Sequence, residues 1–456
     1  MFAKAYDTEI KIDYNQIDGF NSYPSDLMIE YNQCIEEGLD VEQYKELFES
    51  VAAMENGAEK TKKSNEVFEI VLNAGIRADY KYNEPNKLED IKKFRKEHSF
   101  AVSEPCRETL HKKILGAWTG RACGCLLGKT VEGMRSDELI PFLKETGNYP
   151  MHRYILSTDA TDEVCSHYRY SVKNKPYGDN TDGMPVDDDT NYVVLYQQIV
   201  DEYGRDFTSA DVAKSWLKYQ TIYSYFTAER IAYINFINCI EPPASAMYKN
   251  AFREWIGAQI RGDYFGYINP GNPEKAAEMA YRDAVVSHVK NGVYGEMFAA
   301  AMIACAAVTD DIENIIFGGL GQIPSTSRFY ESVMKIYNNF KNGVSFEECY
   351  KYIHSVYDEH TGHGWCHTIS NAMIVTAALL YGEGDFGKSI CKAVDLAFDT
   401  DCNGATVGSV LGMRGGIDCI DDYWKKPING KIHTSIFGIG TVDIEKATEK
   451  TFEHME

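Results

Sequence analysis

Two short acidic segments, about two hundred residues apart, contain the residues best suited to chemistry in this chain. The first is Asp187-Asp188-Asp189-Thr190, and the second begins Asp399-Thr400-Asp401. Neighbouring carboxylates repel one another, and burying them unpaired costs several kcal/mol. A cation held between the segments would remove this cost. Nearly all candidate ligand atoms are oxygen, which favours a hard ion such as Mg²⁺ over Zn²⁺. The two segments therefore predict one split acidic metal site.

Each segment also has a simpler interpretation. An isolated run of three aspartates is usually a solvated turn or the N-cap of a helix. The second segment resembles the start of an EF-hand loop, whose twelfth position must be a bidentate glutamate. That position is Val410 here, and the residues after Gly404 are mostly small and apolar. The EF-hand interpretation therefore fails, and support for a metal site comes from the pair of segments.

Glycines recur at every fourth position beside both acidic regions. They are Gly116, Gly120, Gly124 and Gly128 in the first series and Gly404, Gly408 and Gly412 in the second. A glycine inside a helix costs roughly 1 kcal/mol relative to alanine, so each series needs a reason. A spacing of four puts the glycines on one helix face, where another backbone or a ligand can approach closely. Two tightly packed core helices would explain the pattern, and they would bring Glu132 near the second acidic segment.

Helical patterns dominate the elements that must position these residues. Two stretches are apolar on all sides and predict buried helices, and two more keep apolar residues at three- and four-residue spacing. These four stretches are Met297–Val308, Asn371–Tyr381, Val193–Val200 and Ile390–Ala397. Short strand candidates occur only near the C-terminus, at residues 432–437 and 438–442. The chain is therefore expected to be all-α.

The composition limits the classes of function. The net charge of −22 argues against nucleic acid as the main partner, because phosphate binding needs basic patches. The first ten residues lack the apolar region of a signal peptide, and the apolar runs fall short of the ~20 residues that span a bilayer. Twelve cysteines without paired spacings suit a reducing cytosol. We therefore expect a cytoplasmic protein that is not inserted in a membrane.

The first hundred residues differ from the rest. Ser25–Gly38 and Val41–Val51 predict two amphipathic helices, and polar, charged stretches follow. Ser103, followed two residues later by a proline, has the signals of a new helix start. We therefore expect a helical N-terminal extension over residues 1–103 and a main domain over residues 104–456.

Four motifs follow one another along the main domain. They are Gly124-Cys-Leu-Leu-Gly-Lys-Thr-Val-Glu132, Asp187-Asp-Asp-Thr190, Ser287-His288 before Tyr294-Gly295, and Asp399-Thr-Asp-Cys-Asn-Gly-Ala405. In this order and separation they resemble the ADP-ribosylglycohydrolase family, which includes the ADP-ribosyl-acceptor hydrolases and the dinitrogenase-reductase-activating glycohydrolase. The resemblance implies a compact multi-helix orthogonal bundle with two Mg²⁺ ions in a cleft. It also implies hydrolysis of the bond between the terminal ribose C1 and an acceptor.

The resemblance further implies roles for individual residues. The implied metal ligands are Asp187, Asp188, Asp189, Asp399, Asp401 and, by its position in the motif, Cys402. The implied catalytic residues are Glu132, Asp188 and Asp401, with Glu132 positioning or deprotonating water or protonating the leaving group. The expected substrate contacts are Gly257, Arg261, His288, Tyr294, Gly295 and Asn371.

Three positions depart from the family pattern. Asp187 stands where Thr or Ser is usual, Lys129 where many members have Asp, and Cys402 where Thr or Ser is common. A thiol is a poor ligand for Mg²⁺, so the occupancy of the second metal position stays open.

Two further groups have open interpretations. His360, His363, Cys366 and His367 could bind zinc, line a substrate cleft, or belong to a structural loop. The Tyr264-Phe265 pair could stack on an adenine base, and core packing explains it equally well.

Three functions are compatible with the sequence. The first is a Mg²⁺-dependent hydrolase whose partner is an ADP-ribosylated protein or a small ADP-ribosyl conjugate. The second is a non-catalytic ADP-ribose or nucleotide binder with the same fold, which the departures at Lys129 and Cys402 favour. The third is a metal-dependent phosphoester hydrolase that uses the same carboxylates.

Overall fold

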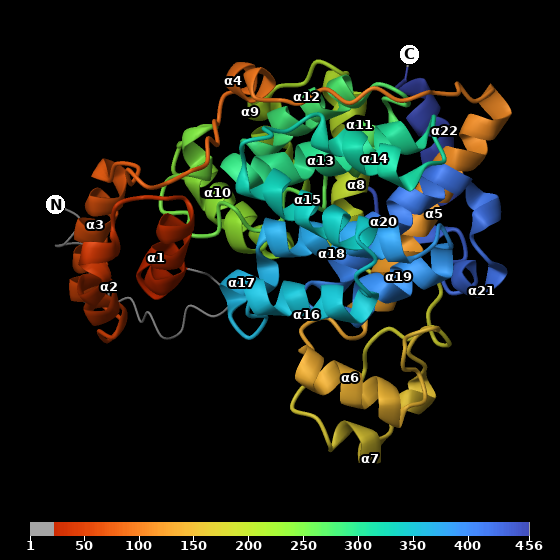
Figure 1. Ribbon diagram of the computed structural model, residues 1–456, viewed down its shortest axis with the longest axis horizontal. Helices are drawn as coiled ribbons and strands as arrows, with labels where there is room; N and C mark the ends of the chain where they lie inside the picture. Colours follow the sequence, from red (N-terminus) through yellow and green to blue (C-terminus); the bar gives the residue numbers. More distant parts are fainter. Residues whose placement is uncertain (1–21, 456) are drawn as a thin grey trace, which may run out of the picture. The chain divides into compact units, whose positions relative to one another are not determined.

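The computed structural model describes residues 22–455, and over this range the protein is all-α apart from one two-stranded sheet (Figure 1). The expectation about a signal peptide concerns residues outside this range. The chain forms two compact units that divide after Lys81, with Lys249–Phe252 belonging to the first unit.

From residue 22 onward, the smaller unit contains three α-helices, α1 (Leu27–Glu36), α2 (Lys45–Ala52) and α3 (Ala58–Asn73). Their apolar faces meet in a core that includes Leu27, Phe48 and Val67. The first two helices were predicted from their apolar spacing. The third helix begins in a stretch that is polar in sequence. Its charged residues lie mostly on the face turned away from this core, so the polar sequence is compatible with a packed helix.

The larger unit contains the remaining helices and the sheet. They are α4 (Leu88–Lys93), α5 (Arg107–Lys129), α6 (Ser136–Glu145), α7 (Asp162–Cys165), α8 (Asp188–Tyr203), α9 (Ser209–Tyr219), α10 (Thr227–Ile237), α11 (Asp263–Tyr267), α12 (Pro273–Ala284), α13 (Lys290–Ala306), α14 (Ile312–Leu320), α15 (Arg328–Lys341), α16 (Phe346–Val356), α17 (Gly362–Cys366), α18 (Thr368–Tyr381), α19 (Phe386–Asp395), α20 (Thr400–Gly415), α21 (Asp422–Lys425), α22 (Ile444–Glu453), β1 (Lys431–His433) and β2 (Thr441–Asp443). The two antiparallel strands lie where the sequence suggested short strands near the C-terminus.

Residues 82–103 belong to the larger unit, although the sequence suggested a boundary at residue 103. The Ser103 amide donates to the carbonyl of Val308 at 2.8 Å, and the Asn83 amide donates to that of Thr326 at 3.1 Å. The Arg328 guanidinium is ion-paired with Glu84 at 3.0 Å. The compact units thus divide 22 residues earlier than the helix-start signal at Ser103 suggested.

The two glycine series pack against each other, as the sequence predicted. Helices α5 and α20 run side by side (Figure 1), and each glycine of α5 lies opposite the backbone of α20. A Cβ atom added at Gly124 would overlap the carbonyl oxygen of Gly404, and one added at Gly120 would overlap that of Gly408. Only glycine allows this approach, which brings the C-terminal end of α5 to the N-terminal end of α20.

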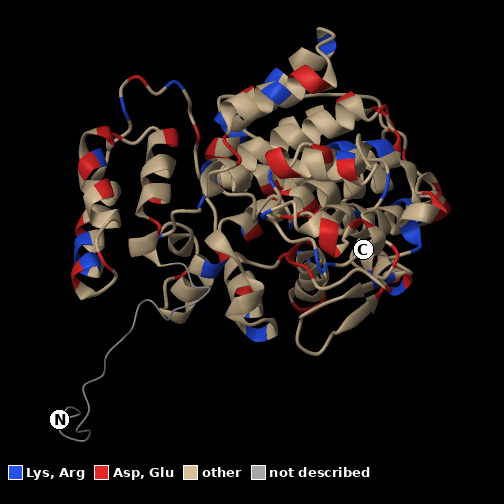
Figure 2. Cartoon of the chain, turned by 90° about the horizontal axis from the view of Figure 1, so that it is seen from below, with Lys and Arg blue, Asp and Glu red and all other residues tan. Residues whose placement is uncertain are grey.

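Helices α13 and α18 form much of the core around this pair. Nearly every residue of both helices is buried, in agreement with the prediction from their apolar sequences. Figure 2 shows acidic and basic positions interspersed along the helices of both units. Among the described residues, no helix is both long enough and apolar enough to span a bilayer.

Candidate functional site

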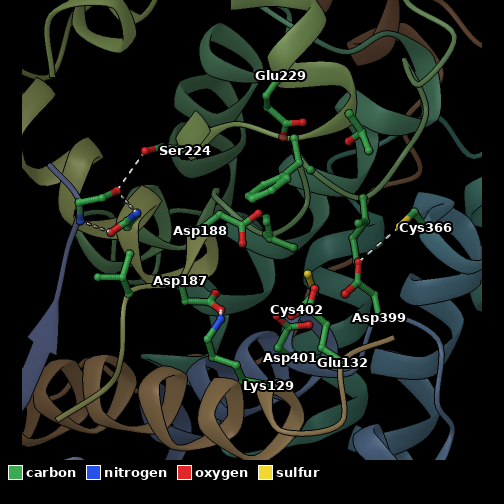
Figure 3. Close-up of a pocket in the computed structure, with 18 of the residues that line it drawn as sticks. Lys129, Glu132, Asp187, Asp188, Ser224, Glu229, Cys366, Asp399, Asp401 and Cys402 are labelled. Atoms are coloured by element: carbon green, nitrogen blue, oxygen red, sulfur yellow. Dashed lines mark hydrogen bonds and ion pairs between the residues drawn. The ribbon is translucent and has the colours of Figure 1, made fainter. Parts of the chain in front are cut away.

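A cavity of about 430 Å³ lies where the two acidic segments meet (Figure 3). It is lined by Lys129, Glu132, Val186, Asp187, Asp188, Asn191, Tyr223, Ser224, Phe226, Thr227, Glu229, Ile256, Gly257, Ile260, Trp365, Cys366, Asp399, Asp401, Cys402 and Ser435. This volume is typical of a pocket for a small-molecule ligand. The segments that were predicted to converge therefore share one wall of one cavity.

Helix ends position the acidic residues. Asp187 is the N-cap of α8, and its Oδ1 accepts a hydrogen bond from the Asp189 amide at 2.9 Å. The sequence raised an N-cap as the simpler interpretation of this run, and Asp187 has that role while it also lines the cavity. Asp399 directly precedes α20, and Asp401 lies in the first turn of that helix. The positive end of each helix dipole faces these carboxylates and partly offsets their repulsion.

Candidate ligand atoms form three groups at this wall or directly behind it. Glu132, Asp399 and Asp401 have one carboxylate oxygen each within 4.8 Å of one another. Asp189, Asp401 and Cys402 form a second such group, in which Asp401 is shared. Cys125, Asp187 and Asp189 form a third group. The first group offers oxygen alone, and the second and third each include a thiol.

Burial makes the carboxylates of this wall hard to ionise. Burial, and then the negative charges of Asp399 and Asp187, raise the pKa of Glu132 to about 7. Burial, and then Glu132 and Asp399, hold the pKa of Asp401 well above its usual range. The pKa of Asp188 is raised in the same way, by burial first and then by its two aspartate neighbours. A divalent cation would reverse these shifts by stabilising the charged forms.

Asp189 has an arginine partner that is itself buried. It is fully buried, and its Oδ1 is ion-paired with Arg121 Nη2 at 3.0 Å. Arg121 also holds Asp263 Oδ2 at 2.7 Å and lies fully within the protein. The predicted metal ligand Asp189 thus does not line the cavity, although its second oxygen has no partner among residues 22–455.

Lys129 contributes a positive charge to the acidic wall. Its ammonium is ion-paired with Asp187 Oδ2, and Figure 3 shows the two side chains pointing toward each other. Burial alone would lower the pKa of Lys129, but Asp187 and Asp401 together raise it above its ordinary value. The lysine therefore stays charged beside the carboxylates.

The residues of the first group fit a hard divalent cation. Asp401 is 2% exposed, and its Oδ1 has no hydrogen-bond partner within the described part of the chain. A buried carboxylate oxygen without a partner is costly, and a cation would satisfy it. Three carboxylates in one group are the ligand type that Mg²⁺ and similar ions prefer.

Glu229 lies on the side of the cavity opposite the two acidic segments (Figure 3), and it was not among the residues predicted from the sequence. Its carboxylate is 2% exposed and accepts a hydrogen bond from Arg261 Nη1 at 3.0 Å. A side chain at Gly257 would overlap this carboxylate, so the glycine leaves space for it beside the cavity. Burial raises the pKa of Glu229 to about 7, although the charge of Arg261 opposes the shift. The sequence of α10 also contains Arg230 and Asn235, so it held no signal that singled out Glu229.

Aromatic side chains near the cavity are not those that the sequence suggested for base stacking. Tyr264 and Phe265 are completely buried in the core, which was the alternative interpretation of this pair. Tyr223 and Phe226 line the cavity and are 66% and 49% exposed. Trp365 also lines it, and its ring lies 4.3 Å from the guanidinium carbon of Arg135.

Of the expected substrate contacts, Gly257 lines the cavity. Arg261 is fully buried, and Glu229 and Asp283 Oδ2 hold it at 3.0 and 2.5 Å. His288 is 1% exposed, and its Nδ1 lies 2.8 Å from Ser287 Oγ. Neither side chain is among those that line the cavity.

The other three expected contacts, Asn371, Tyr294 and Gly295, do not line the cavity. Asn371 accepts a hydrogen bond from the Asp399 amide at 3.3 Å through its Oδ1, and so fixes the start of the second acidic segment. Tyr294 donates its hydroxyl to the carbonyl of Pro85, and Gly295 faces the side chain of Thr368.

The histidine-rich loop contributes to the cavity through two of its residues. Trp365 and Cys366 line it, and Cys366 Sγ lies 3.8 Å from Asp399 Oδ2. His363 and His367 are buried and do not line the cavity, and His360 is exposed. This arrangement favours the substrate-cleft interpretation of the loop over a zinc site built from its own histidines.

These observations define an all-α protein in which two distant acidic segments converge on one ligand-sized cavity. Residues 107–455 match the family described as ADP-ribosylglycohydrolase, and the chain therefore belongs to the ADP-ribosylglycohydrolase family. Membership supports a glycohydrolase activity.

One solved structure, titled "ADP-ribosylglycohydrolase-related protein complex", is similar in fold with a TM-score of 0.50. It is 18% identical, and the match covers 76% of this chain and 100% of that one. No curated protein matches the chain.

Proposed function

We propose that this protein is a Mg²⁺-dependent hydrolase that cleaves the bond between ribose C1 and an acceptor in an ADP-ribosylated protein or a small ADP-ribosyl conjugate. The observation that carries the proposal is the group formed by Glu132, Asp399 and Asp401, whose carboxylates meet in a ligand-sized cavity. Membership of the ADP-ribosylglycohydrolase family supports the reaction class.

The acidic wall suits the charge that develops in this reaction. Cleavage at C1 builds positive charge on C1 and the ring oxygen in an oxocarbenium-like transition state. Carboxylates beside that position, among them Asp188, stabilise this charge because the cavity shields them from water. A bound divalent cation orients ribose hydroxyls and lowers the pKa of bound water.

Glu132 is the residue assigned to proton transfer. Burial and the neighbouring carboxylates raise its pKa to about 7 in the ion-free protein, and a cation beside it would lower that pKa and keep the carboxylate ready to accept a proton. It is half-buried at the cavity wall and so can reach a ligand. In this role it positions or deprotonates the attacking water, or protonates the leaving group.

Glu229 and the exposed aromatic rings give the cavity a second, less charged side. The Arg261 contact fixes the Glu229 carboxylate as an oriented acceptor for hydroxyl or amine donors. Tyr223 and Phe226 offer ring faces that suit a planar base. This arrangement matches a ligand that carries both a sugar and a base.

The proposal is tested by incubating the purified protein with ADP-ribosyl-arginine, ADP-ribosyl-serine and simple ribosides, with Mg²⁺ or with EDTA. Liberated ADP-ribose that requires the ion is the expected result. Release of AMP and a phosphoribosyl conjugate instead, by cleavage of the diphosphate bridge, would favour a phosphoester hydrolase.

A non-catalytic ADP-ribose binder is the second candidate. It is favoured by the ammonium of Lys129, which lies directly in the acidic wall. Saturable binding of ADP-ribose without turnover of any conjugate would support this candidate and contradict the hydrolase.

A further inference from the structure

The acidic wall of the cavity divides into a part that already has a cation and a part that has none. Asp187 Oδ1 accepts from the Asp189 amide at 2.9 Å, and Asp187 Oδ2 is ion-paired with Lys129. Asp189 Oδ1 is ion-paired with Arg121 at 3.0 Å, which leaves only Asp189 Oδ2 without a partner among residues 22–455. Three of the four carboxylate oxygens of Asp187 and Asp189 are therefore engaged by donors of the chain itself.

The other part of the wall has no such compensation. No Lys, Arg or His of the described range forms an ion pair with Glu132, Asp399 or Asp401. Asp401 is 2% exposed, and its Oδ1 points to no donor within that range. Because an unpaired buried carboxylate is strongly unfavourable, a cation from outside the chain would stabilise the charged forms in this half of the wall.

We infer that Lys129 takes the place of one divalent cation and that the cavity binds a single hard cation, at Glu132, Asp399 and Asp401. The inference rests on the proposed function only in that the cavity takes up a divalent ion. It differs from the two-ion site that the family resemblance implies.

The position of Lys129 explains why a second ion is excluded. It is the last residue of α5, and the packing of α5 on α20 holds it at the acidic wall. Its ammonium occupies the Asp187 oxygen that an ion in the group of Cys125, Asp187 and Asp189 would need, and it supplies positive charge at the same place. Cys402 does not replace the lost oxygen ligand for a hard ion, because a thiol is a soft ligand.

The test counts Mn²⁺ ions, which bind to Mg²⁺-type oxygen sites and give an electron paramagnetic resonance signal. The full chain is stripped with EDTA, dialysed against Mn²⁺, and examined for bound metal and for its spectrum. We expect about one ion per chain and a six-line spectrum of an isolated ion. Two ions per chain with a spin-coupled spectrum would overturn the inference and leave the proposed hydrolase intact. No bound ion would contradict both.

Variants of Lys129 separate its charge from its packing. Lys129→Met and Lys129→Gln remove the charge, and both should raise the count from about one to about two ions with a spin-coupled signal. Lys129→Arg keeps the charge and should still bind one ion. Lys112→Met, at a surface lysine of α5 that is paired with Asp418, is the matched control and should also bind one. A folded neutral variant that binds one ion would show that Lys129 does not exclude the second ion. Should both neutral variants fail to fold, the number of ions bound by the unaltered chain decides whether the cavity holds one ion or two.

Discussion

Two clusters of buried carboxylates meet at the cavity, which Glu229 of the first cluster also lines, but they are neutralised in different ways. The Arg261 cluster consists of Arg261, Glu229, Asp283 and Glu296, and its guanidinium contacts Glu229 at 3.0 Å and Asp283 at 2.5 Å. The cavity carboxylates consist of Glu132, Asp187, Asp188, Asp399 and Asp401, and among them Asp187 alone has an ion-pair partner in the described chain.

The difference separates a structural cluster from a functional one. Arg261 is fully buried, and its hydrogen bonds to Glu229 and Asp283 leave no place for an outside cation. Glu296 lies 3.7 Å from Arg261, and burial, and then the charge of Asp283, hold the pKa of Glu296 well above its usual range. The cavity carboxylates instead face a space that a ligand can enter. Carboxylates that are paired with Arg261 thus stabilise the fold, whereas the cavity carboxylates without an ion-pair partner in the described chain mark the proposed metal site.

Removing the central cation of the Arg261 cluster should have the largest effect. Arg261→Met leaves Glu229 and Asp283 buried without their partner, and breaking a buried pair in this way costs about 3–5 kcal/mol. The expected result is a large fall in the free energy of unfolding, measured by guanidinium denaturation. Arg169→Met removes an arginine that is 76% exposed, so this control should change stability by less than about 1 kcal/mol. An Arg261→Met protein as stable as the control would end the structural interpretation of this cluster.

Removing a charge from the cavity carboxylates should lower activity strongly without lowering stability. Asp401→Asn takes away an oxygen ligand and should abolish Mg²⁺-dependent release of ADP-ribose, a loss of about 100-fold or more. In EDTA, its unfolding midpoint should equal or exceed that of the unaltered protein, because one of several repelling carboxylates is gone. Unchanged turnover of Asp401→Asn would remove this residue from the metal site.

Glu132→Gln probes proton transfer within the same wall. The amide keeps the shape of the side chain and loses its ability to accept a proton, so kcat should fall about 100-fold. Binding of ADP-ribose, measured by calorimetry, should be retained. A variant that loses binding while bound substrate reacts at the normal rate would show that Glu132 is not catalytic.

The smallest predicted effect is a dependence of ion affinity on pH. Glu132 has a pKa of about 7 and must be deprotonated to bind a cation, so protons compete with the ion at lower pH. The apparent dissociation constant for Mn²⁺ should therefore rise about tenfold as the pH falls from 8 to 6. Glu132→Gln should flatten this dependence, and an equally steep profile in that variant would assign the proton to another group.

The comparison also shows what the sequence could predict. The four-residue glycine spacing predicted a close neighbour, either another backbone or a ligand, and the packing of α5 on α20 agrees with the first of these interpretations. That packing places Glu132 beside Asp399 and Asp401, which was the predicted convergence. The buried helices α13 and α18 were equally evident from their composition.

The sequence could not predict which charged residues pair with each other inside the protein. Arg261 was expected at the substrate, and instead its side chain lies between Glu229 and Asp283, which come from two other helices. The pairing of Lys129 with Asp187 across 58 residues was equally hidden. Residue types show that charges need partners, and only the arrangement of the helices decides which partner each one has.

The most direct test of the account is a crystal structure of the full chain soaked in Mn²⁺, with anomalous scattering recorded near the manganese edge. The account predicts a peak bound by carboxylate oxygens of Glu132, Asp399 and Asp401, at distances typical of a hard divalent cation. A map with no peak in the cavity, or with a peak at a site that none of these three residues contacts, would contradict it.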